Sequence, residues 1–108
     1  MNLPTETFGN VVVVHTPEEL GRDQAEDFQQ FVTSLSHQRV VVDLDNTESL
    51  DSQGLTALLD AQDKLFEAGG NIKVATTNAY NRKILEITRL DRQLEVFESV
   101  IDAVKSYR

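Results

Sequence analysis

The chain has 108 residues and 40% of them are hydrophobic, which suits one domain, residues 1–108, with a buried core. It has no cysteine, which excludes disulfides, thiolate metal sites and cysteine nucleophiles. Its net charge of −8 disfavours binding to nucleic acid and to anionic membranes, so we expect proteins or small molecules as partners. The chain has neither a secretory signal pattern nor an apolar run long enough for a membrane span, so we expect a cytoplasmic protein without membrane insertion.

The first fifteen residues predict a β-hairpin. The β-branched run Val11–His15 is typical of a short strand. The turn residues Phe8-Gly9-Asn10 precede it, so Leu3–Thr7 can pair with it as the second strand.

An amphipathic helix follows, and its start has two alternatives. Thr16 can cap it, with Glu19 completing a capping box, or the helix can begin at Asp23 with Glu26 three residues later. Apolar residues then recur with the 3.6-residue period of a helix, at Phe28, Phe31, Val32 and Leu35.

The remaining sequence alternates apolar strands with amphipathic helices. We expect strands at Arg39–Asp45, Asn71–Thr76 and Leu94–Phe97. Three helical stripes lie between and after these strands: Leu55, Leu58, Leu59, Leu65 and Phe66; Tyr80, Ile84 and Ile87; and Val100, Ile101, Val104 and Tyr107. Gly69-Gly70 is typical of a helix end, and Ser99 can cap the last helix. The order β-β-α-β-α-β-α-β-α predicts an α/β fold with a mixed, mostly parallel sheet of four to five strands and about four helices.

The loop from Asp43 to Ser52 follows the carboxyl end of a buried strand, where sites form in parallel sheets. Its first half, Asp43–Thr47, resembles the nucleophile loop of haloacid-dehalogenase-type phosphatases, which use the first Asp as nucleophile together with Mg²⁺. Only 61 residues follow this pattern, and no later strand ends in a pair of Asp residues. A small phosphatase using Asp43 is therefore a remote alternative, and we interpret these carboxylates as ending a strand and beginning a turn.

No pattern predicts a metal or a cofactor. Read as a calcium loop from Asp43, the stretch has Glu48 where Gly is needed and Gly54 where Glu is needed. Neither His15 nor His37 accompanies a nucleophile elbow, so we interpret both as surface or boundary residues. Gly69-Gly70 is expected to end a helix, whereas a phosphate-binding loop opens one, so this glycine pair does not predict a nucleotide-binding site.

Ser52, in the second half of the loop, lies just before the helix that carries Leu55. By residue type and place Ser52 is expected to be the N-cap of this helix, and Gly54 is expected to leave the nearby backbone open to an approaching protein. A phosphate on Ser52 would add a charge of about −1.5 to −2. An exposed helix start tolerates such a charge better than a close-packed interface does, so a switch at Ser52 should act mainly on binding.

The stretch "VVVDLDNTESLDSQGLTALLDAQDKLFEAGGNIKVA" resembles the central signature of STAS domains, in particular the bacterial anti-anti-sigma factors. That signature is an apolar strand ending in Asp, a loop, Asp-Ser-x-Gly-Leu opening a helix, then Gly-Gly and another strand. The stretch "RKILEITRLDRQLEVFESVIDAV" is similar to the family's closing segment. The resemblance spans most of the chain from Val11 to Val104 and implies a STAS-like domain without catalytic activity or cofactor.

The resemblance also implies a binding partner and a switch. Ser52 matches the serine that is phosphorylated by a serine-kinase anti-sigma factor, which the unphosphorylated form binds, and a metal-dependent serine phosphatase resets the switch. Asp51 matches the residue before the phosphoserine, and Gly54 and Leu55 match the helix start that faces the kinase. We expect a monomer or weak dimer. The alternative is a STAS domain that serves as a structural subunit of a lipid-transport or signalling assembly, with Ser52 only as a cap.

Three departures from the family pattern concern the expected binding surface. Glu18–Gly21 replaces the common Gly-Glu-Leu-Asp, which leaves Glu19 but removes the Asp. Gln53 stands where Ser or Thr is frequent, and Arg89 interrupts a common Ser-Gly-Leu. We therefore expect Glu19, Gln53 and Arg89 to influence which partner binds.

Overall fold

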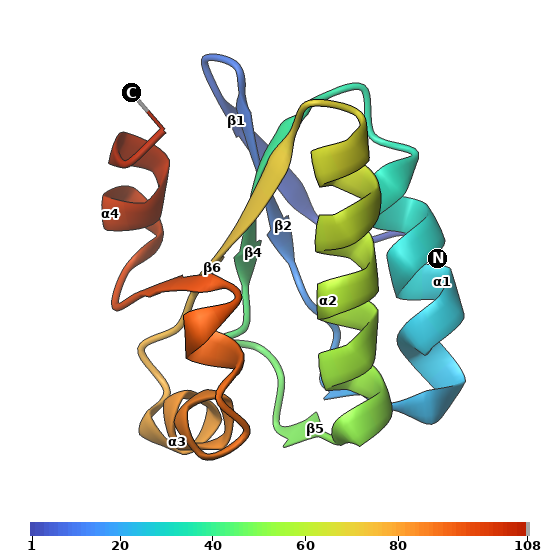
Figure 1. The fold of residues 1–108 in the computed structure, drawn as a ribbon, viewed down its shortest axis with the longest axis vertical. Helices are drawn as coiled ribbons and strands as arrows, with labels where there is room; N and C mark the ends of the chain where they lie inside the picture. The colour runs from blue at the N-terminus through green and yellow to red at the C-terminus, as the bar shows by residue number, and fades with distance from the viewer. Residues whose placement is uncertain (108) are drawn as a thin grey trace.

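A mixed five-stranded sheet with helices on both faces forms the framework of the computed structural model, which describes residues 1–107 (Figure 1). Its elements are β1 (Thr5–Phe8), β2 (Val11–His15), β3 (Glu19–Leu20), α1 (Arg22–Thr33), β4 (Arg39–Asp43), β5 (Ser49–Leu50), α2 (Ser52–Glu67), β6 (Asn71–Ala75), α3 (Ala79–Ile87), the 3₁₀ helix η1 (Leu90–Arg92), β7 (Glu95–Phe97) and α4 (Val100–Lys105).

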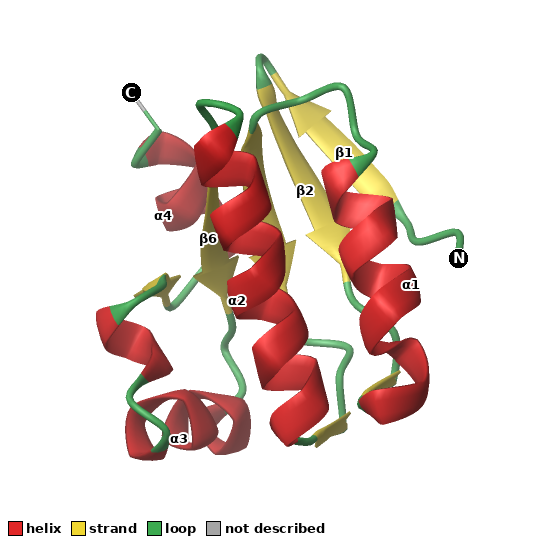
Figure 2. Cartoon of the chain, turned by 45° about the vertical axis from the view of Figure 1, so that its right-hand side comes forward, coloured by secondary structure: helices red, strands yellow, loops and turns green. Residues whose placement is uncertain are grey.

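The strands of the main sheet run in the order β1-β2-β4-β6-β7. Only β1 is antiparallel to its neighbour, because a tight turn joins it to β2, and the other pairs are parallel. The helices α1 and α2 cover one face, α4 lies on the other, and α3 lies beyond the carboxyl ends of the central strands (Figures 1 and 2). Within residues 1–107 this matches the predicted α/β class with a mostly parallel sheet and four α-helices, so the fold prediction is confirmed.

The apolar runs of β2 and β4 are buried on both faces of the sheet, as their continuous valines predict. Alternate side chains pack under α1 and α2, including Val12, Val14, Val40 and Val42. The others, including Val11, Val13 and Val41, pack with Ala103 of α4. The valines of β2 and β4 are therefore buried on both faces, and polar side chains, His15 and Asp43, stand at the carboxyl ends of these strands.

The first helix begins at Arg22, so the expected start at Thr16 with Glu19 is wrong and the start near Asp23 is the closer one. Thr16 is buried, and its hydroxyl donates to the backbone oxygen of Asp43. Glu19 instead lies in β3, which pairs in parallel with β5, and the sequence analysis predicted neither of these two-residue strands. The pairing of β3 with β5 joins two segments that are far apart in the chain, so the local sequence pattern around Glu19 could not predict it.

Several apolar residues of the predicted stripes do not reach the core. Leu65 is buried, but the adjacent Phe66 is 72% exposed because it lies about 100° around the helix from Leu65. Three further members of the stripes are also exposed: Tyr80, Ile87 and Ile101. The cap at Ser99 is confirmed, since its hydroxyl accepts from the Asp102 amide.

Candidate functional site at the start of α2

Asp51, and not Ser52, caps α2. One carboxylate oxygen of Asp51, Oδ1, accepts from the amides of Gln53 at 2.9 Å and Gly54 at 3.0 Å. Ser52 is the first helical residue, so its prediction as the N-cap is wrong. Its side chain is exposed, and within residues 1–107 its hydroxyl forms no hydrogen bond. The capping requirement is therefore met without Ser52, and its hydroxyl remains available at the surface.

The same carboxylate joins the starts of two helices. Its second oxygen, Oδ2, accepts from the Arg22 amide at the start of α1 at 3.3 Å. A Cβ atom on Gly21 would lie 2.6 Å from this oxygen, so glycine at position 21 leaves space for the carboxylate. The hydrogen bond from the Gly54 amide, with those from Arg22 and Gln53 and the Arg22 charge, holds the pKa of Asp51 below its ordinary value. This negative charge lies beside Ser52 in sequence and is held by backbone donors.

Gly54 and Leu55 lie beneath the surface. A Cβ atom on Gly54 would lie 2.8 Å from the carbonyl carbon of Leu20 and closer still to its oxygen, so glycine lets α2 approach β3. Leu55 is 7% exposed and belongs to the main core. The expectation that Gly54 opens the backbone to a partner is wrong, because the backbone of β3 already occupies that space.

The remaining predicted binding residues divide into two groups. Glu19, Asp51 and Gln53 line one polar groove of about 350 Å³ between the starts of α1 and α2. Arg22 and Ser49 line it too, and the sequence analysis did not predict either. Arg89 is exposed at the end of α3, in a left-handed conformation with φ of 63°, and is not part of that groove.

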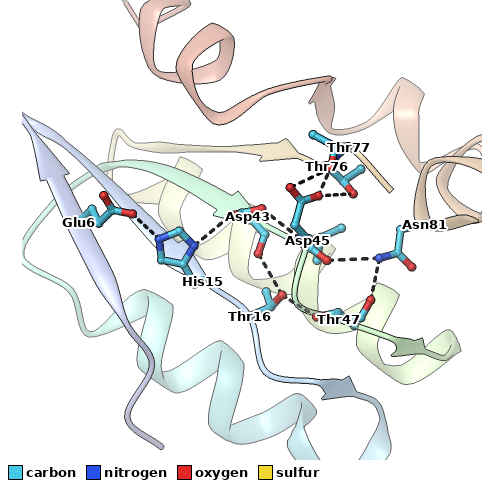
Figure 3. Close-up of polar contacts among 10 residues, drawn as sticks. Glu6, His15, Thr16, Asp43, Asp45, Thr47, Thr76, Thr77 and Asn81 are labelled. Atoms are coloured by element: carbon cyan, nitrogen blue, oxygen red, sulfur yellow. Dashed lines mark hydrogen bonds and ion pairs between the residues drawn. The ribbon is translucent and has the colours of Figure 1, made fainter. Parts of the chain in front are cut away.

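The two carboxylates of the phosphatase-like pattern have structural partners. Asp43 is 8% exposed, and its oxygens accept from the Asp45 amide at 3.0 Å and contact the His15 ring at 2.9 Å. Asp45 accepts from the Thr76 hydroxyl and from both the amide and hydroxyl of Thr77 (Figure 3). Asp43 thus links the end of β4 to His15 of β2, and Asp45 links the turn after β4 to the residues after β6, as expected for residues that end a strand and begin a turn.

Thr47 anchors the loop that leads from β4 to Ser52, a role that the sequence analysis missed. Its buried hydroxyl donates to the backbone oxygen of Pro17 at 2.6 Å and contacts the Thr16 hydroxyl at 2.5 Å. Asn81, fully buried in α3, donates to the backbone oxygens of Leu44 and Thr47 (Figure 3). A threonine within a polar loop carries no local signal of burial, so only the packing of α3 and the β2–β3 connection identifies it.

Across residues 1–107, no three His, Asp or Glu side chains converge in a way that could hold a metal ion. In the same part of the chain, none of the helices has the length and apolar character that a membrane crossing needs.

Comparison with known proteins identifies the family. A family model described as Mlab, STAS domain, matches residues 5–100. A Thermotoga maritima protein provisionally named an anti-sigma factor antagonist is 22% identical over 97% of this chain and 96% of its own length.

Solved structures share the fold. The crystal structure of an anti-sigma factor antagonist from Mycobacterium paratuberculosis has a TM-score of 0.85 at 24% identity, covering 97% of this chain and 92% of that one. The Bacillus cell fate determinant SpoIIAA, solved in its phosphorylated form, has a TM-score of 0.71 at 15% identity, covering 99% of this chain and all of that one. With the family model spanning most of the chain, these matches show that the chain belongs to the STAS domain family.

Proposed function

We propose that this chain is an anti-sigma factor antagonist that binds a serine-kinase anti-sigma factor and is switched off by phosphorylation of Ser52. The observation that carries the proposal is that two neighbouring residues, Asp51 and Ser52, have different roles at the start of α2. Asp51 caps the helix, and the exposed Ser52 hydroxyl makes no hydrogen bond within residues 1–107. A kinase can thus modify Ser52 without removing a helix cap.

The charges around Ser52 determine what a phosphate would do. Its charge of about −1.5 to −2 would meet favourable backbone amides at the helix start, worth about 0.3–1 kcal/mol, and the repelling carboxylate of Asp51. These effects oppose each other at an exposed position, so the folded domain tolerates the phosphate. An interface packed against Ser52 would have to enclose the same charge, which costs far more unless basic groups pair with it. Phosphorylation therefore acts on binding more than on folding.

The partner surface is centred on the groove beside Ser52. Glu19, Asp51 and Gln53 supply its exposed side chains, while the buried Gly54 and Leu55 set the position of the helix start. Arg89 lies outside the groove and would contact a partner only if that partner extends to the end of α3. The names of the Thermotoga and Mycobacterium relatives support an anti-sigma factor as partner, and the phosphorylated form of SpoIIAA supports regulation by phosphate. A metal-dependent serine phosphatase would reverse the modification.

The test compares four purified proteins: the wild type, Ser52→Ala, Ser52→Asp and the control Ser36→Asp. Ser36 is exposed and does not line the groove, so Ser36→Asp adds an equal charge outside the proposed partner surface. Each protein is incubated with the candidate anti-sigma kinase and ATP, the phosphorylated residue is identified by mass spectrometry, and binding is measured by calorimetry.

We expect phosphate on Ser52 in the wild type and none in Ser52→Ala. We expect Ser52→Asp to weaken binding by about tenfold or more, and Ser36→Asp to weaken it much less, because the penalty arises where the interface closes over the charge. Phosphate found only on other residues, or equal binding by Ser52→Ala and Ser52→Asp, would contradict the proposal.

A second candidate function is a non-phosphorylated structural subunit in a transport or signalling assembly. The description of the matching family model, Mlab, STAS domain, favours it, since it is not the description of a sigma-factor regulator. On this alternative neither Ser52→Ala nor Ser52→Asp changes partner binding, and no kinase modifies the chain. The same four proteins therefore separate the two functions.

A further inference from the structure

His15, the last residue of β2, lies between two carboxylates from the neighbouring strands. Its Nδ1 atom is 2.9 Å from Oδ2 of Asp43 on β4, and its Nε2 atom is 2.6 Å from Oε1 of Glu6 on β1 (Figure 3). A carboxylate only accepts hydrogen bonds, so both ring nitrogens must donate, and only the protonated imidazolium can do this. The arrangement thus requires a positively charged histidine that bridges two strands.

The electrostatic environment of His15 favours that charged form. Partial burial, with 19% of the side chain exposed, by itself lowers the pKa of His15. The hydrogen bonds to Glu6 and Asp43 and the charges of these two groups outweigh burial, and the pKa is raised above 6.5. Glu6 from β1 and Asp43 from β4 are the charged groups that face the ring.

The bridge matters most for β1, the outermost strand. All four residues of β1 are exposed, and within residues 1–107 its only strand partner is β2. Besides the ladder with β2, the backbone oxygen of Pro4 accepts from the His15 amide. Through the imidazolium, Glu6 is also tied to β4, which lies in the middle of the sheet. The ring thus attaches an exposed edge strand to a strand in the middle of the sheet whose valines are buried.

We propose that His15 is a proton-operated clamp that holds β1 on the sheet, and that its deprotonation loosens β1 while leaving the start of α2 in place. Loss of the ring proton removes one of the two donors, so the link to Glu6 or the link to Asp43 is lost. The cap of α2 consists of hydrogen bonds from the Gln53 and Gly54 amides to Asp51, and Thr47 anchors the loop before it. Within residues 1–107, neither Asp51 nor Thr47 forms a hydrogen bond with His15.

The sign of the pH dependence follows from the raised pKa. The hydrogen bonds of the imidazolium stabilise the folded state fully at pH values below the ordinary histidine pKa of 6.5. This stabilisation is lost as the pH rises through the raised pKa of His15. We therefore expect β1 to be held firmly in mildly acid solution and to open more often in alkaline solution.

Amide hydrogen exchange of the labelled full chain, followed by NMR at about pH 6 and about pH 9 and corrected for intrinsic rates, tests the clamp. We compare the wild type with His15→Gln, Glu6→Gln and the control His37→Gln. Glu6 is exposed, so Glu6→Gln keeps the fold even if His15→Gln disturbs it. The ring signals of His15 report its titration in the same samples.

In the wild type and in His37→Gln, protection of the β1 amides should fall several-fold at the higher pH relative to the β4 amides, while the first turn of α2 stays unchanged. In His15→Gln the β1 protection should be low at both pH values. In Glu6→Gln the ring of His15 should titrate at a lower pH than in the wild type. Equal protection of β1 at both pH values in the wild type, or an undiminished pH effect in His15→Gln, would overturn the proposal.

Discussion

Replacing Gly54 by alanine tests the packing of α2 against β3. In an exposed helix this change stabilises a protein by about 1 kcal/mol, because alanine has the higher helix propensity. Here the new Cβ would approach the carbonyl group of Leu20 to 2.8 Å from its carbon and closer still to its oxygen, which is nearer than real Cβ contacts. The new Cβ is fixed to the backbone of α2 and its neighbour is the backbone of β3, so neither can rotate to relieve the clash. The helix α2 must therefore move away from β3.

Overpacking of this kind costs about 1–3 kcal/mol, and a clash with backbone belongs at the upper end. After the gain in propensity is subtracted, we expect Gly54→Ala to be about 2 kcal/mol less stable than the wild type. For a domain of this size that corresponds to a melting temperature lower by about 8 °C. Urea unfolding and calorimetry measure the two quantities.

Gln53→Ala is the matched control, since Gln53 is the exposed neighbour of Gly54 in the same first turn. We expect this variant to unfold within about 0.5 kcal/mol of the wild type. If Gly54→Ala is as stable as the wild type and loses only partner binding, glycine at position 54 serves the partner and not the packing of α2, and the reasoning from Leu20 is refuted.

Two further predictions concern Asp51 and Lys73. We expect Asp51→Ala to lower the urea midpoint at pH 7 through loss of its caps, and Asp51→Asn to keep the cap geometry without the charge. Because the pKa of Asp51 is lowered, its charge stabilises the fold fully above pH 3.8, the ordinary pKa of an aspartate. This stabilisation is lost as the pH falls through the lowered pKa, so the urea midpoints of the wild type and Asp51→Asn should converge in acid. Lys73, 7% exposed, donates to the Ser106 hydroxyl and backbone oxygen, so Lys73→Met should lower the free energy of unfolding by about 1–3 kcal/mol, whereas Lys83→Met, at an exposed position, should change it little. Equal unfolding curves for Lys73→Met and Lys83→Met would show that the contacts of Lys73 with Ser106 contribute no stability.

The regular elements could be predicted from the sequence because their signals are local. Runs of β-branched residues mark β2 and β4, and the 3.6-residue period marks α1 and α2. Their alternation leads to a largely parallel sheet, which the structure contains. Ser99 was predicted as a cap for the same reason, since its partner is the amide only three residues later.

The details of the site could not be predicted in the same way. Asp51 and Ser52 are both good capping residues by type, and the choice between them depends on where the helix begins. The structure shows that Asp51 also accepts from the Arg22 amide, 29 positions away, which no local pattern indicates. Gly54 likewise resembles an open backbone position until Leu20, far away in the chain, is seen to pack against it.

The amino-acid sequence by itself determined the fold class and the serine that begins α2, because both depend on residue type and short spacing. The tertiary structure decided how that serine is presented. It assigned the cap to Asp51, packed Gly54 against β3, buried Leu55 in the main core, and joined His15 to Glu6 and Asp43 from two other strands. These contacts join residues far apart in the chain, and their energies depend on distances and burial that only the folded chain defines.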